Sequence, residues 1–219
     1  MKRIRSVAPL SIVVPATILA LVMVMMMAAT LVACGSSGDS SGTTTAGDVK
    51  TKTYTDSDYG YSFDYPETWK VEDSATSDVT AGGTATGNVG VYDPEGTVVD
   101  KTYLDLMMVT VYKLNGVVDD SVIPQLKGEI ESVLASLESQ DSSMKVEEAL
   151  AETTAAGMKG YKVTYSFTKK DTPTTSTLYF LFNGDTEYQL TTQASTANWE
   201  ADQPIFDAMI ASFRPATAE

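Results

Sequence analysis

The chain has 219 residues, with 15 lysine and arginine residues, 29 carboxylates, one cysteine and no histidine, and its formal charge is -14. The length allows one domain with a leader or tail. Because histidine is the commonest general base and ligand for zinc, copper and iron, and an acidic surface repels phosphates, the composition disfavours histidine-based enzymes, sites for those metals and nucleic-acid partners.

The N-terminal region consists of a basic tip, an apolar run from Ile12 to Val32 and small residues. This order is typical of a secretory signal. About 20 apolar residues can also span a bilayer, so an uncleaved anchor is the alternative. Leu31-Val32-Ala33-Cys34 resembles the bacterial lipobox. The resemblance implies cleavage between Ala33 and Cys34 and a lipid on the Cys34 thiol. It therefore favours a cleaved signal peptide over an uncleaved anchor.

Three parts are expected: a lipoprotein signal peptide over residues 1–33, the lipidated Cys34 with a flexible tether of Gly, Ser and Thr over residues 34–48, and a globular domain over residues 49–219. The Gly/Ser/Thr tract cannot bury enough apolar surface to fold. Two acyl chains anchor stably. We therefore expect the domain to be lipid-anchored at the extracytoplasmic face of the cell membrane. The three signal cations are lost, which leaves 12 cations against 29 carboxylates, a formal charge of −17.

Two strands joined by a turn at Ser57-Asp58-Tyr59-Gly60 are predicted between Lys50 and Tyr65. Aromatic residues alternate along this stretch, so they share one face: Tyr59, Tyr61, Phe63 and Tyr65. Such a face forms part of a core or a platform that stacks on sugars, and the core is the commoner use.

The stretch from Ser74 to Asn88 is rich in Thr, Ser, Gly and Asp, which predicts a loop or a weak edge strand. A short strand is expected over Val89–Tyr92, before the turn Asp93-Pro94-Glu95-Gly96. The next strand, Tyr103–Leu114, is apolar on both alternating faces. A strand of this kind must be covered on both faces, which favours a sheet between helical layers.

An amphipathic helix follows Asp119-Asp120-Ser121, which offers a possible N-cap. Pro124 must lie in its first turn. Its apolar residues recur at helical spacing: Leu126, Ile130, Val133, Leu134 and Leu137. The opposite face carries glutamates, so the helix is expected to pack on the sheet and not on a membrane.

The remaining strands are predicted over Lys145–Ala151, Tyr161–Thr168, Leu178–Phe182 and Glu187–Thr192, with a tight hairpin at Asn183-Gly184. A last helix is expected from Asn198, its candidate N-cap, to Arg214. Pro204 should separate a first turn from the main helix. The helix carries one apolar stripe: Trp199, Phe206, Met209, Ile210 and Phe213.

The stretch Gly60-Tyr61-Ser62-Phe63-Asp64-Tyr65-Pro66-Glu67-Thr68-Trp69 resembles the opening of PsbP-like domains, and Phe206 to Phe213 resembles their terminal helix. The likeness covers Lys50 to Arg214 in outline. It implies an α+β fold, the PsbP-like α/β/α sandwich, with a mainly antiparallel central sheet and helices on both faces. It also implies protein binding without catalysis. Photosynthetic members use histidine among their metal-associated groups, and this chain has none.

Four short patterns resemble known sites but lack their companions. Gly38 to Gly42 matches G-x-S-x-G without a histidine base, and Ser142 to Lys145 matches S-x-x-K without its partner motifs. Gly82 to Gly87 has phosphate-loop spacing without the Lys-Ser/Thr pair, so it is interpreted as a loop. Asp56 to Gly60 begins like a calcium loop but reads better as a hairpin turn.

The sequence thus predicts a membrane-anchored extracytoplasmic lipoprotein that is not an enzyme. Its expected role is an accessory or assembly domain that binds another membrane or envelope protein. The alternative is a small-molecule or calcium binding module that uses acidic loops. No catalytic residue, metal ligand or cofactor is assigned. A pair of carboxylates that acts as in a glycosidase is not excluded, because the sequence does not give the distance between two carboxylates in the folded protein.

Overall fold

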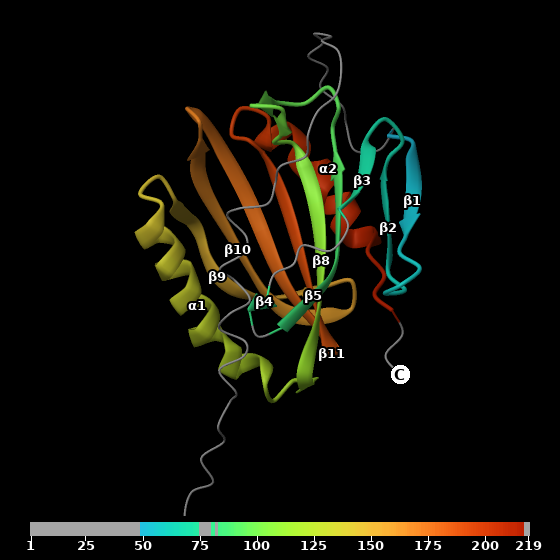
Figure 1. Cartoon of the computed structure of the whole chain (residues 1–219), viewed down its shortest axis with the longest axis vertical. Coiled ribbons are helices and arrows are strands. Elements are labelled where there is room, and N and C mark those ends of the chain that lie inside the picture. Colours follow the sequence, from blue (N-terminus) through green and yellow to red (C-terminus); the bar gives the residue numbers. More distant parts are fainter. Residues whose placement is uncertain (1–48, 75–79, 82, 217–219) are drawn as a thin grey trace, which may run out of the picture.

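The computed structural model describes residues 49–74, 80–81 and 83–216. The predicted signal peptide and tether, with Ala33, Cys34 and the Gly38–Gly42 pattern, lie outside the described residues. The thin grey trace of Figure 1 marks the parts that are not described.

The fold is mostly antiparallel sheet with two helices (Figure 1). The main sheet has the strand order β3-β5-β8-β11-β10-β9, and β4 pairs with β5. Its strands are β3 (Lys70–Ser74), β4 (Thr80–Ala81), β5 (Gly83–Tyr92), β8 (Leu106–Val118), β9 (Lys145–Ala155), β10 (Met158–Lys169) and β11 (Thr172–Ser195). Two ribbons lie outside it: β1 (Thr51–Thr55) with β2 (Ser62–Pro66), and β6 (Val98–Val99) with β7 (Thr102–Tyr103).

β11 doubles back within its 24 residues. The backbone N–H of Thr196 donates to the carbonyl of Pro173 over 2.8 Å, and the hydroxyl of Ser176 donates to the carbonyl of Thr192 over 3.0 Å. Gly184 has a φ of 64°, which suits a tight turn. The predicted hairpin at Asn183-Gly184 is therefore confirmed, and its two arms pair with β10 and β8.

β8 is buried along both faces over its first half, as its sequence predicts. Met107, Val109 and Val111 belong to a core cluster that contains the buried residues of α2 (Trp199–Ser212). We call it the α2 cluster. The aromatic side chains of the β1–β2 ribbon close it, since Tyr61 and Phe63 are fully buried there, so the interpretation of these aromatics as core is confirmed.

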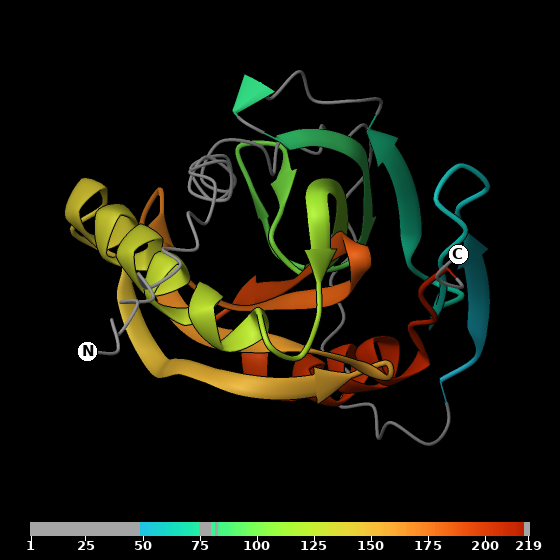
Figure 2. The ribbon, with the colours of Figure 1, turned by 90° about the horizontal axis from the view of Figure 1, so that it is seen from below.

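A second core cluster contains α1 (Ile123–Gln140) and is called the α1 cluster. All five residues of the predicted helical stripe are buried in it. Leu178 and Phe180 of β11 belong to this cluster, whereas Leu181 belongs to the α2 cluster, so successive residues of one strand feed two cores. Figure 2 shows the strong curvature of the sheet and the separation of α1 from α2. The described chain is mostly β, and full helical layers on both faces are not confirmed.

The sequence predicts a loop or a weak edge strand over Ser74–Asn88, and for residues 83–88 the strand is confirmed and the loop is wrong. Residues 83–92 form β5, which lies between β3 and β8 and pairs with both. β3 pairs only with residues 88–92 and β4 only with residues 83 and 84, so residues 85–87 have β8 as their one partner among the described strands and form a weak edge. Pairing with β8 overrides the weak strand propensity of these small and polar residues. The Gly82–Gly87 pattern therefore lies mostly in a strand and not in a loop.

The helix starts also differ from the predictions. The carboxylate of Asp119 accepts hydrogen bonds from the backbone N–H groups of Ser121 and Val122, so it closes a turn before α1, whose N-cap position is Val122. Asn198 does occupy the N-cap position of α2, but its side chain bonds elsewhere. α2 runs through Pro204, which costs little because the carbonyl it leaves unbonded lies in an exposed first turn.

Asp105 ties α2 to the sheet. Its buried carboxylate accepts hydrogen bonds from the backbone N–H groups of Thr97 and Ser195 and from the side-chain amide of Asn198, each over 2.8 Å. Three donors offset the cost of burying this charge. Burial, then the nearby carboxylates of Asp105 and Asp93, raise the pKa of Asp202 in the first turn of α2 to about 7.

Gly128 should be a site of easy stabilisation. It lies on the exposed face of α1, where an added Cβ would meet no atom within 4 Å. Gly128→Ala is expected to raise the free energy of unfolding by about 0.5–1 kcal/mol, because alanine loses less backbone entropy in a helix. The measurement is urea unfolding followed by circular dichroism. The control is Gly160→Ala, whose Cβ would lie 1.8 Å from the carbonyl oxygen of Phe180 and should destabilise the fold. Equal effects of the two changes would contradict this packing.

Asp202 should make stability fall as the pH rises. Its folded pKa of about 7 lies above its ordinary 3.8, so between these values the folded state holds a proton that the unfolded state has released. Asp202→Asn should therefore leave stability nearly unchanged near pH 4 and raise it at pH 8, by on the order of 1 kcal/mol after allowance for partial exposure. Thermal melts from pH 4 to 8 check this. The control is Asp207→Asn, an exposed carboxylate on the same helix; a gain that is independent of pH argues against the prediction.

Candidate functional site

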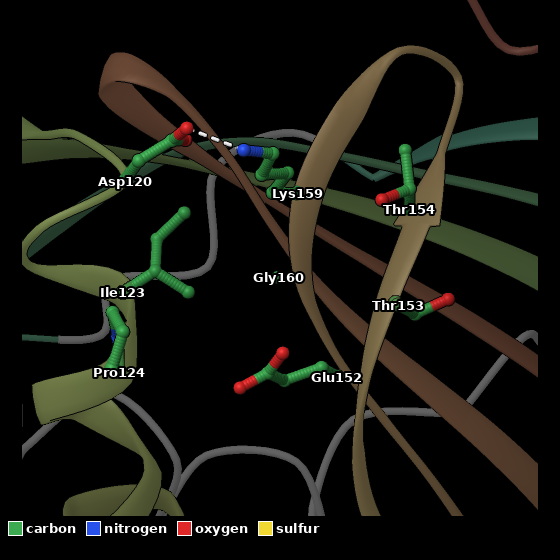
Figure 3. A pocket seen from close by; sticks show the side chains of 8 residues that line it. All are labelled: Asp120, Ile123, Pro124, Glu152, Thr153, Thr154, Lys159 and Gly160. Atoms are coloured by element: carbon green, nitrogen blue, oxygen red, sulfur yellow. Dashed lines mark hydrogen bonds and ion pairs between the residues drawn. The ribbon is translucent and has the colours of Figure 1, made fainter.

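A pocket of about 360 Å³ lies between the start of α1 and the β9–β10 hairpin (Figure 3). Its lining combines carboxylates, an amine, hydroxyls and apolar groups: Asp120, Ile123, Pro124, Glu152, Thr153, Thr154, Lys159 and Gly160. We call it the β9 pocket. A volume of this size accommodates a side chain with its neighbours or a small ligand.

Local packing fixes the walls of the β9 pocket. The hydroxyl of Tyr161, buried in the α1 cluster, donates to the carbonyl of Ile123 over 3.1 Å and so holds the first turn of α1 against β10. Gly160 lets β10 approach β11 closely, since any Cβ would meet Phe180. The turn between β9 and β10, at Ala156-Gly157, has positive φ at both residues, which matches the twist of a tight hairpin.

The electrostatics of the β9 pocket leave one negative charge unbalanced. Asp120 forms an ion pair with Lys159. Glu152 makes no hydrogen bond or ion pair within the described part of the chain, and Figure 3 shows its carboxylate extended toward Pro124. Burial, then the carboxylates of Glu152 and Glu131, raise the pKa of Tyr161. The pocket therefore favours a cation over an anion.

β9 forms one end of the main sheet, so its outer edge faces no other strand among those described. Residues 151–155 pair in regular register with β10, whereas the register shifts between Lys162 and Tyr165, opposite the first half of β9. Thr153 and Thr154 of the regular half line the β9 pocket. A free strand edge and a pocket thus adjoin each other.

A second pocket, of about 180 Å³, lies between the β1–β2 ribbon and α2. Its lining is Val49, Thr51, Asp64, Tyr65, Pro66, Pro204, Ile205, Ala208, Met209 and Ser212. The hydroxyl of Ser212 accepts from the backbone N–H of Asp64 over 2.8 Å and joins the two walls. The Ser212 hydroxyl and the Asp64 amide therefore bond to each other, and this pocket has fewer polar groups available to a ligand than the β9 pocket.

Two neighbouring polar side chains inside the sheet, Glu187 and Gln189 of β11, are only partly satisfied by hydrogen bonds. Glu187 of β11 is buried, and burial raises its pKa to about 7 although it accepts a hydrogen bond of 2.8 Å from the amide of Gln189. The amide oxygen of Gln189 is buried and has no hydrogen-bond partner in the described structure. Tyr112 of β8 lies directly across from Glu187 in the strand register. An unsatisfied buried acceptor of this kind is unusual and costly.

Two of the short sequence patterns, the S-x-x-K pattern and the start of a calcium loop, form turns in the described part of the chain. The hydroxyl of Ser143 accepts from the backbone N–H of Thr168, and its neighbour Met144 is buried in the α1 cluster, so the S-x-x-K pattern builds a turn. The carboxylate of Asp56 accepts from the N–H groups of Asp58 and Tyr59, which confirms a hairpin turn there. No group of three residues that could hold a metal ion occurs among the described residues.

Neither of the two described helices is both long and apolar enough to cross a membrane.

No sequence pattern marks the pocket residues as binding groups. The sequence predicts Asp120 at a helix start, and Glu152 lies one residue beyond the predicted strand Lys145–Ala151. Lys159 and Asp120 are far apart in the chain and meet only because β10 packs beside the start of α1. The periodicity of apolar residues predicts which face of a helix or strand is buried, but it does not predict a contact between two residues that are far apart in the sequence.

Similar folds occur among solved structures. Cyanobacterial PsbP (CyanoP) from Synechocystis sp. PCC 6803 is 15% identical, with a TM-score of 0.50, and the match covers 84% of this chain and 98% of that one. LpqN of Mycobacterium tuberculosis, described as involved in cell envelope biogenesis, is 10% identical, with a TM-score of 0.47 and coverage of 77% and 92%. A Bacteroides thetaiotaomicron protein is 13% identical, with a TM-score of 0.45, and the match covers 72% of this chain but 45% of that one.

At these identities the match to CyanoP shows the fold alone. No curated protein sequence matches the chain significantly. The family model described as PsbP-like protein matches residues 11–214, which is nearly the whole chain. The resemblance of the Gly60–Trp69 opening and the Phe206–Phe213 close is thereby confirmed, and the chain belongs to the PsbP-like protein family.

Proposed function

We propose that this protein is a lipid-anchored extracytoplasmic domain that binds another envelope protein as an accessory or assembly factor. The observation that carries the proposal is the β9 pocket beside the free edge of β9. A sheet edge offers backbone hydrogen bonds to a partner segment, and a neighbouring pocket selects its side chains. Together they form a surface suited to a protein partner.

A role without catalysis is supported by how the polar side chains are used. Asp105, Asp56 and Ser143 bond to backbone N–H groups or orient turns and helix ends. Such contacts build the turns and helix junctions of the fold. The absence of histidine from the whole sequence points the same way.

Anchoring at the membrane is supported by the place of Cys34 in the sequence. It follows the apolar run directly and is the chain's only cysteine. A tether of about 14 residues reaches roughly 20 Å, so the domain would stay close to its membrane. Partners are then expected among proteins that sit in, or near, the same membrane.

The anchor can be tested by Cys34→Ala. The variant is expected to lose incorporation of labelled fatty acid completely and to leave the membrane fraction, because the thiol is the proposed acceptor. Cys34→Ser is a second variant that keeps the size of the side chain and should behave alike. Labelling that persists in both variants would refute the lipobox assignment.

Protein binding can be tested by crosslinking in intact membranes. A photoreactive residue at Thr154, on the free edge of β9, should capture a discrete neighbour, whereas the same residue at Gly128, on the exposed face of α1, should not. Failure to recover a protein neighbour from any surface position would refute an accessory role.

A second function is favoured by the buried, unsatisfied amide oxygen of Gln189. A small ligand that donates an N–H or O–H group to it, beside the carboxyl of Glu187, would remove the cost of that orphan acceptor. We propose this small-molecule module as the alternative. Calorimetry of the whole protein against cell-wall fragments, which carry such donors, tests it, and a separate titration with calcium tests the calcium form of the alternative. Flat titrations would remove this alternative.

A further inference from the structure

Three features coincide at the β9 pocket. They are the free edge of β9, the unpaired carboxylate of Glu152 and the apolar wall formed by Ile123 and Pro124. We propose that β9 is a docking edge for one extended segment of the partner protein, which adds as a further strand and places a lysine or arginine side chain in the β9 pocket. This inference rests on the proposed function and names the chemistry of the partner.

The docking edge is limited to the second half of β9. Register shifts interrupt the pairing opposite the first half, and such irregularities twist an edge away from new partners. Residues 151–155 remain regular, and they include Glu152, Thr153 and Thr154 of the pocket. A partner segment of about five residues would therefore pair there.

The carboxylates of β9 differ in a way that identifies the charged contact. Glu147 accepts a hydrogen bond of 2.6 Å from Ser166, and Glu148 accepts one of 3.2 Å from Thr164, so both are used across the strand pair. Glu152 has no such bond within the described residues, and Figure 3 shows it facing the open pocket. Among these three glutamates, Glu152 is the one available to a partner's cation.

The pocket chemistry selects a basic side chain. Lys159 is already paired with Asp120, so a second cation does not meet an uncompensated positive charge, whereas an anion would meet the carboxylate of Glu152. The methylene stem of lysine or arginine can lie along Ile123 and Pro124 while its charged end reaches Glu152. The formal charge of −17 in the predicted mature chain adds long-range attraction for a basic segment.

The test uses the full mature protein in detergent and a labelled, end-capped peptide with the sequence Thr-Val-Thr-Arg-Thr-Val-Thr. The matched peptide carries citrulline, which has the shape of arginine without its charge. Fluorescence anisotropy should show that the arginine peptide binds about threefold to tenfold more tightly, as expected for an exposed charge pair. Glu152→Gln should abolish this difference, and the control Glu148→Gln should preserve it.

Strand addition has its own readout. Binding of the arginine peptide should slow hydrogen exchange at the amides of residues 151–155, and N-methylation of alternate peptide amides should weaken binding at least about tenfold. No measurable binding, equal affinity of the two peptides, or protection elsewhere would overturn the inference. If crosslinking still finds a protein neighbour at another surface, the proposed function stands while this docking edge falls. If no neighbour is found anywhere, the proposed function falls as well.

Discussion

The burial of the central strands on both faces is the constraint on which the rest of this structure depends. In β8, Met107 and Val109 pack in the α2 cluster, while Leu106 and Tyr112 on the alternate face are buried too. Two-faced apolar strands cannot leave a face in water, so cover is obligatory. The α2 helix and the aromatic β1–β2 ribbon cover the face that carries Met107 and Val109, and the α1 helix covers Leu178 and Phe180 of β11.

This constraint also bears on the docking edge that we propose. Because the described helices and the aromatic ribbon pack on sheet faces, the end of the strand order is a natural place for contact, and β9 is such an end. The start of α1 is held beside it by the bond from Tyr161 to Ile123, which turns a plain edge into an edge with a pocket. The same packing that builds the core therefore shapes the proposed docking surface.

The carboxylates of this acidic protein are treated in different ways, and the differences have consequences. Asp105 receives three N–H donors and stabilises the junction of α2 with the sheet. Burial raises the pKa of Glu187 to about 7 although the amide of Gln189 donates to it, and burial, then the nearby carboxylates of Asp105 and Asp93, raise the pKa of Asp202 to about 7. Glu152 remains at the surface without a partner in the described chain. The structural role of Asp105 thus follows from its donors and the raised pKa values of Glu187 and Asp202 from burial, while the exposed Glu152 is the group to which we assign recognition by proposal.

Much of the fold could be predicted from the sequence because its signals are local. The period-two pattern of β8, the helical stripe of α1, the turn at Asp56–Gly60 and the hairpin at Asn183-Gly184 each depend on residues that are neighbours in the chain, and the structure confirms them. The quoted motifs likewise sufficed to indicate the PsbP-like family.

Long-range contacts settled the remainder. Residues 83–88 carry no strong strand signal, yet they belong to β5 because β8 supplies a paired strand beside them. Asn198 is a good capping residue, but its amide bonds to Asp105, a partner from far along the chain. The β9 pocket depends on the packing of α1 beside β10. Local patterns determine whether a segment forms a helix or a strand and which of its faces is buried. Contacts between side chains that are far apart in the sequence depend on how the helices pack on the sheet to form the two core clusters.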